Sequence, residues 1–145
     1  MNTNSVAAGS DLPTDSNEPG RNLRHMWGVI TTLLVAAIFI EAVFAGAMLS
    51  GAGWARAAHS ATAAILIAST ISSGLVCVIT LRRIPHGLKL GLALLSLAVV
   101  LLLQAAIGAL NAKGANLLWV HVPLGVALIG FAVRITARAR RLGGE

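Results

Sequence analysis

The stretch that decides the fold is LLLQAAIGALNAKGANLLWVHVPLGVALIGF, residues 101–131. It contains the end of one long apolar run, a short polar link and the start of another apolar run. Gln104 and His121 interrupt these runs, and each stands one helical turn before a glycine, Gly108 or Gly125. Because polar and ionisable residues are expensive at membrane depth, they mark a candidate functional site by default.

The composition of the whole chain supports a membrane location. Of its 145 residues, 57% are hydrophobic and only 11% are charged. The apolar residues form blocks of about 20, which at a rise of about 1.5 Å per residue match a hydrocarbon core of about 30 Å. Inside lipid the backbone must satisfy its own hydrogen bonds, so these blocks are expected to be helices.

The sequence therefore predicts an all-α protein, an integral membrane antiparallel four-helix bundle with a disordered N-terminal tail. The links between the apolar blocks are short, which favours antiparallel neighbours. The sequence predicts three parts: a tail over residues 1–24, a four-helix domain over 25–138 and a basic tail over 139–145. The four helices are expected at about 27–49, 57–81, 88–110 and 117–135, with ends placed to within a few residues.

The arginines and lysines orient the chain in the membrane. The net charge is +6, but the basic residues stand at the ends of the apolar blocks, which argues against a nucleic-acid partner and for membrane lipid. With a cytoplasmic N-terminus, the outer links carry only Arg56 and Lys113, and the other nine basic residues are inside. This positive-inside bias predicts a multi-pass protein of a bacterial-type cell (inner) membrane with both termini cytoplasmic.

Four polar residues are expected to converge in the outer half of this bundle. His59 and His121 lie near the outer ends of the second and fourth helices, while Glu41 and Gln104 lie about 12 and 9 Å inside the outer boundary on the first and third. Helix bundles hold haem between facing histidines, and the second and fourth helices of such a bundle can be diagonal. The sequence thus predicts haem b, with His59 and His121 as iron ligands and Gln104 beside them.

Neighbouring residues suit such a site. Ala63 and Gly125 stand one turn after the two histidines and are small enough for a macrocycle to lie flat. Arg56 stands one turn before His59, at the surface where haem propionates would emerge. Zinc suits the pattern less well, because it takes three or four ligands and the helices offer two histidines and one carboxylate.

Glu41 is the only acidic residue in the predicted membrane region. It either bridges two helices by hydrogen bonding to Gln104 or a histidine, or handles protons at a haem or in a transporter. The residues alone leave these roles open, so Glu41 remains a candidate proton-handling group.

The run LLQAAIGALNAKGANLLWVHVPLGVAL, residues 102–128, resembles the third-to-fourth helix segment of the haem A synthase family. That segment likewise has a glutamine, a glycine one turn later, a short outer link and a haem-ligating histidine that opens the next helix. The resemblance covers about residues 27–135 and implies that His59 and His121 ligate haem. Most family members contain two such modules, so a homodimer would restore their arrangement.

One departure separates the chain from that family. Arg56 stands where the family has a glutamate one turn before the helix-two histidine, and Ser60 follows His59 where the family has an arginine. The resemblance therefore implies haem binding more firmly than haem modification, unless Glu41 replaces the missing carboxylate.

Several functions remain open on these residues. The leading hypothesis is a b-type cytochrome-like membrane protein that acts in electron transfer, with a respiratory-chain redox partner, or in haem handling. Two axial imidazoles saturate the coordination of the iron, which favours electron transfer over oxygen activation. The alternatives are a haem A synthase-like haem-modifying enzyme, a small proton-coupled transporter that uses Glu41, and a cofactor-free accessory subunit of a respiratory complex.

Overall fold

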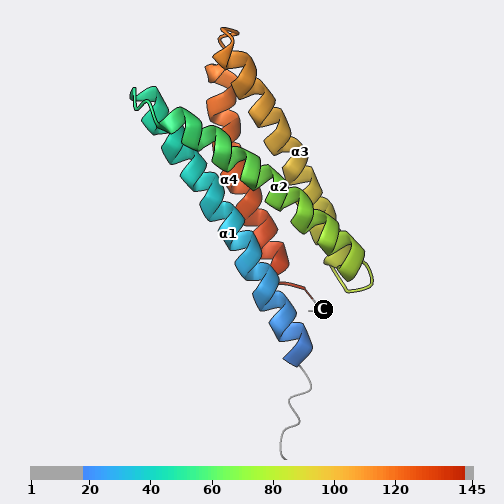
Figure 1. Ribbon diagram of the computed structural model, residues 1–145. Coiled ribbons are helices and arrows are strands. Elements are labelled where there is room, and N and C mark those ends of the chain that lie inside the picture. Colours follow the sequence, from blue (N-terminus) through green and yellow to red (C-terminus); the bar gives the residue numbers. More distant parts are fainter. Residues whose placement is uncertain (1–17, 143–145) are drawn as a thin grey trace, which may run out of the picture.

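Four long helices make up the protein in the computed structural model, which describes residues 18–142 (Figure 1). They are α1 (Glu18–Leu49), α2 (Ala55–Leu81), α3 (Gly87–Ala112) and α4 (Leu118–Ala139). Each is long and apolar enough to cross a membrane. The all-α class and the four predicted helices are therefore confirmed, with most helix ends within a few residues of their predicted positions.

The first helix begins earlier than the sequence suggested. Residues 18–24, which were assigned to the disordered tail, belong to α1, and residues 1–17 of that tail lie outside the described residues. Pro19 lacks a backbone N–H, but the first turn of a helix has no intrahelical acceptor for one, so a proline there does not interrupt the helix.

The fourth helix also extends beyond its predicted end at residue 135. It reaches Ala139, and both Ala139 and Leu142 are fully buried in the same apolar cluster as Trp27 of α1. The basic side chains of this segment are exposed, while Thr136, Ala139 and Leu142 are buried. The first part of the predicted basic tail, as far as Leu142, is therefore packed against the bundle, and residues 143–145 lie outside the described residues.

Each helix packs against two others, in the cyclic order α1, α2, α3, α4 and back to α1. Among the described residues, α1 does not pack against α3, nor α2 against α4, so these two pairs are the diagonals of the bundle. The α1–α2 and α3–α4 links lie at the upper end of the bundle in Figure 1, and the α2–α3 link lies at its lower end. Residues near the starts of α2 and α4 are therefore at the same end.

The core is centred on α3, which buries four leucines on one side. Leu90, Leu94, Leu97 and Leu101 are each 6% exposed or less and repeat with the helical period. The opposite surfaces of the bundle carry many exposed large apolar side chains, among them Phe39, Ile65 and Val126. Contiguous apolar surface of this kind fits contact with lipid.

Close approach between α2 and α3 depends on two glycines. A Cβ atom at Gly74 would lie 3.1 Å from the backbone nitrogen of Leu95, and one at Gly91 would lie 2.8 Å from the backbone nitrogen of Val78. Small residues permit such contacts between membrane helices. Gly46 of α1, in contrast, has no atom within 4 Å of its Cβ position and lines a cavity.

Candidate functional site

One cavity of about 310 Å³ lies among the four helices and brings the predicted polar residues together. Its lining includes Glu41 from α1, His59 from α2, Gln104 from α3 and His121 from α4. The rest of the wall is apolar and includes the small side chains Ala63 and Gly125. Arg56 is exposed and does not line this cavity, although it was predicted to take part in the site.

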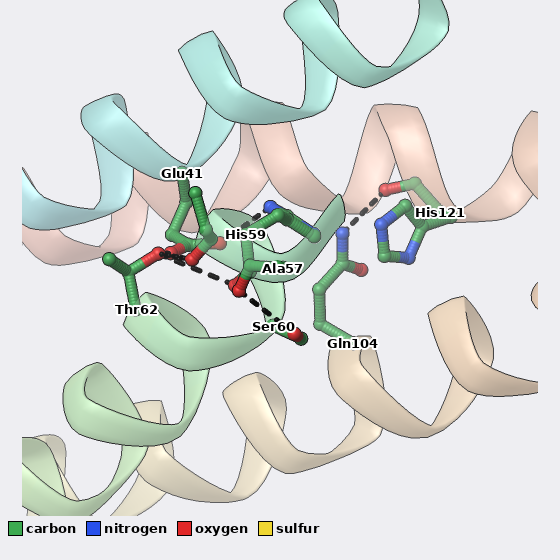
Figure 2. Close-up of polar contacts among 8 residues, drawn as sticks. Glu41, Ala57, His59, Ser60, Thr62, Gln104 and His121 are labelled. Atoms are coloured by element: carbon green, nitrogen blue, oxygen red, sulfur yellow. Dashed lines mark hydrogen bonds and ion pairs between the residues drawn. The ribbon is translucent and has the colours of Figure 1, made fainter. Parts of the chain in front are cut away.

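Glu41 of α1 and His59 of α2 are in direct contact in the site (Figure 2). The Oε2 atom of Glu41 lies 2.7 Å from Nδ1 of His59, and the two side chains are only 12% and 24% exposed. A histidine that binds a metal usually donates its other ring N–H to a carboxylate or carbonyl group. The contact at Nδ1 leaves Nε2 of His59 as the nitrogen with a free lone pair.

Thr62, which is not one of the predicted site residues, contacts the same carboxylate. Its hydroxyl donates to Oε1 of Glu41 and lies 2.8 Å from the backbone carbonyl oxygen of Ala58 (Figure 2). Thr62 stands three residues after His59, so both side chains are on one face of α2. That spacing is the signal by which Thr62 was detectable in the sequence.

The ring of His121 rests on the backbone of α3 at Gly108. A Cβ atom at Gly108 would lie 3.0 Å from Cε1 of the imidazole, closer than an ordinary van der Waals contact. Gln104, one turn earlier on α3, donates from Nε2 to the backbone oxygen of His121 at 2.7 Å (Figure 2). The glutamine and glycine of the motif therefore both serve to place His121.

Gly125 lies beside the Gln104 side chain. A Cβ atom there would lie 3.2 Å from Nε2 of Gln104, so the absence of a side chain leaves room for the Gln104 amide. Contact of Gly125 with a macrocycle stays a prediction from the sequence. The structure shows that Gly125 first accommodates a neighbouring side chain, while still lining the cavity.

The α3–α4 link sets the position at which α4 begins. Gly114 and Asn116 adopt left-handed conformations, with φ of 96° and 52°. The side-chain oxygen of Asn111 accepts a hydrogen bond of 2.9 Å from the backbone N–H of Leu117. The N–H of His121 then bonds to the carbonyl oxygen of Leu117 at 2.9 Å, in the first turn of α4. This tight link holds the His121 backbone at the same end of the bundle as His59.

The polar groups that line the cavity are two imidazoles, one carboxylate and one amide. Across residues 18–142, no cluster of three or more histidine, cysteine, aspartate or glutamate side chains has a metal-binding arrangement, which disfavours zinc. Nδ1 of His121 and Oε1 of Gln104 are buried without a hydrogen-bond partner in the described part of the chain. Such buried polar atoms are costly and suggest that a further group completes the site.

Compared with models of protein families, with curated proteins and with solved structures, the chain matches none of them.

Proposed function

We propose that this chain is a haem-binding integral membrane protein of the b-type cytochrome kind, acting in electron transfer or haem handling. Haem b would be held between His59 and His121. The observation that carries the proposal is the cavity itself, because it receives one histidine from each of two diagonal helices and is otherwise nearly apolar.

The residues fit haem in three respects. Glu41 occupies Nδ1 of His59 and leaves Nε2 for iron. His121 lies across the bundle from His59, on a helix that does not pack against α2. Leu101, Leu128 and the small residues of the wall offer an apolar surface to a macrocycle. When bound between two imidazoles, haem supplies reversible one-electron chemistry without an open coordination position.

The proposal includes a membrane setting for the bundle. The helices would cross the membrane in antiparallel order, with the links at residues 50–54 and 113–117 outside and both termini in the cytoplasm. The nine basic residues then lie on the cytoplasmic side, with Arg56 and Lys113 outside. The cavity would open in the outer half of a bacterial-type cell membrane, where a redox partner of the respiratory chain can exchange electrons with it.

Absorbance spectroscopy of the purified protein tests the proposal. Protein from haem-replete cells should show a Soret band and, after dithionite reduction, sharpened α and β bands. His59→Ala and His121→Ala should each lose most of the bound haem, whereas His86→Ala in the α2–α3 link should keep it. A colourless wild-type protein, or equal haem loss in the His86 control, would contradict the assignment.

A haem-modifying enzyme is the second candidate, and the position of Glu41 favours it. The haem A synthase family has a glutamate where this chain has Arg56, but Glu41 brings a carboxylate to the same cavity from α1. Extraction and chromatography of cellular haems, with and without the gene, test this activity. A new haem species that depends on the gene and on Glu41 would support the enzyme, and an identical haem profile would remove it.

A further inference from the structure

Helix α1 supplies neither of the two proposed haem ligands, yet it contributes the one carboxylate of the cavity. Glu41 Oε2 lies 2.7 Å from Nδ1 of His59. The other acidic residues of the chain belong to its terminal segments and are far in sequence from residues 41 and 59. They are Asp11, Asp15, Glu18 and Glu145. His59 therefore has a dedicated acceptor from a neighbouring helix.

Both oxygens of this carboxylate are engaged by α2. His59 approaches Oε2, and the hydroxyl of Thr62 donates to Oε1. The Thr62 hydroxyl also lies 2.8 Å from the backbone carbonyl oxygen of Ala58, one turn earlier in α2. A carboxylate held at both oxygens has little freedom to rotate, so it offers Nδ1 of His59 an acceptor in a defined direction.

The two histidines are unequal in this respect. Nδ1 of His121 has no acceptor among the described residues, and its ring packs against Gly108. The imidazole of His59 thus has a carboxylate oxygen 2.7 Å from Nδ1, whereas Nδ1 of His121 has no such contact among the described residues.

We propose that Glu41 is a positioning residue for His59, with Thr62 fixing Glu41 in turn. Glu41 accepts the Nδ1–H of His59, selects that tautomer and turns Nε2 toward the cavity. Such a carboxylate also makes the ligating imidazole more basic. The inference rests on the proposed function for the identity of the ligand, but the tautomer of His59 is a property of the chain alone.

The first arm of the test uses haem-free protein in detergent. Nitrogen-15 NMR of histidine-labelled protein at pH about 9, where free imidazoles are neutral, reports which ring nitrogen carries the proton. The wild type should show His59, assigned with His59→Ala, as the Nδ1–H tautomer. Glu41→Ala should lose this preference, and Glu41→Gln, which keeps an oxygen acceptor, should restore part of it. An unchanged His59 tautomer in Glu41→Ala would overturn the inference.

Thr62→Val supplies a second variant that leaves the carboxylate in place. It should weaken the tautomer preference in the same direction as Glu41→Ala, by a smaller amount. Thr80→Val is the matched control, because Thr80 is also on α2 and bonds only to its own backbone, at Val76. Equal effects of the two threonine variants would overturn the proposed role of Thr62.

The second arm uses haem-loaded protein and a redox titration. Loss of the carboxylate should favour ferrous over ferric iron by about tenfold, which is an upward shift of about 59 mV in midpoint potential for one electron. Glu41→Ala should show this shift and Thr80→Val should not. A haem-loaded Glu41→Ala protein with the wild-type potential overturns the inference while leaving the proposed function intact. A wild-type protein that binds no haem overturns the proposed function, and the tautomer arm then still decides the role of Glu41.

Discussion

Replacing Gly91 with alanine should weaken the contact between α2 and α3. The added Cβ atom would lie 2.8 Å from the backbone nitrogen of Val78 and 3.2 Å from its Cα atom. Because backbone atoms cannot rotate away as a side chain can, the two helices have to separate. Ordinary carbon contacts begin near 3.5 Å, so the required separation is about 0.5 Å or more.

The expected cost combines two opposing effects. Overpacking of this kind destabilises proteins by about 1–3 kcal/mol. Alanine recovers about 0.5–1 kcal/mol over glycine within a helix. We therefore expect Gly91→Ala to lower the free energy of unfolding by a net amount of about 0.5–2 kcal/mol.

Gly130→Ala is the matched control for this measurement. Gly130 is in the interior of α4 and has no atom within 4 Å of its Cβ position. The Gly130→Ala protein should therefore be as stable as the wild type or slightly more stable, because alanine has the higher helix propensity. Both variants are compared with the wild type by unfolding from mild detergent into dodecyl sulfate, followed by far-ultraviolet circular dichroism. A Gly91→Ala protein as stable as Gly130→Ala would refute the close α2–α3 contact.

Three further substitutions test the site and the core. Gly108→Ala should push the His121 ring by a few tenths of an ångström, since the new Cβ would be 3.0 Å from Cε1. The ratio of Soret to protein absorbance should then fall while the helix content stays unchanged. An unchanged ratio would show that Gly108 does not place the ring. Gln104→Leu removes the 2.7 Å hydrogen bond to the His121 carbonyl and should cost about 0.5–1.5 kcal/mol in the same unfolding assay; no loss would mean that the bond is not formed. Leu94→Ala, at a fully buried position, should cost about 2–5 kcal/mol, and a loss below about 1 kcal/mol would argue against a core centred on α3.

Much of the site was predictable because position along a helix follows directly from residue number. His59 and His121 both fall near helix starts, and two successive links separate those starts, so they were expected at one end of the bundle. Glu41 and Gln104 were placed within reach by counting residues back from helix ends. The cavity that all four residues line confirms this convergence.

The contacts within the site were not predictable in the same way. Helices that are apolar nearly all round carry no polar stripe to indicate which face turns inward. The sequence left Glu41 free to pair with Gln104 or with a histidine, and the rotation of α1 against α2 selects His59 and adds Thr62. Arg56 is exposed and does not line the cavity.

The sequence alone therefore determined the number of helices, their apolar character and the position of each polar residue along its helix, because these depend on composition and on the rise per residue. Only the tertiary structure decided which side chains meet. It assigned Gly108 to the His121 ring, Gly125 to the Gln104 amide, and Gly74 and Gly91 to the α2–α3 contact. These pairings depend on how each helix is rotated about its axis, which is set by the interlocking of side chains between helices.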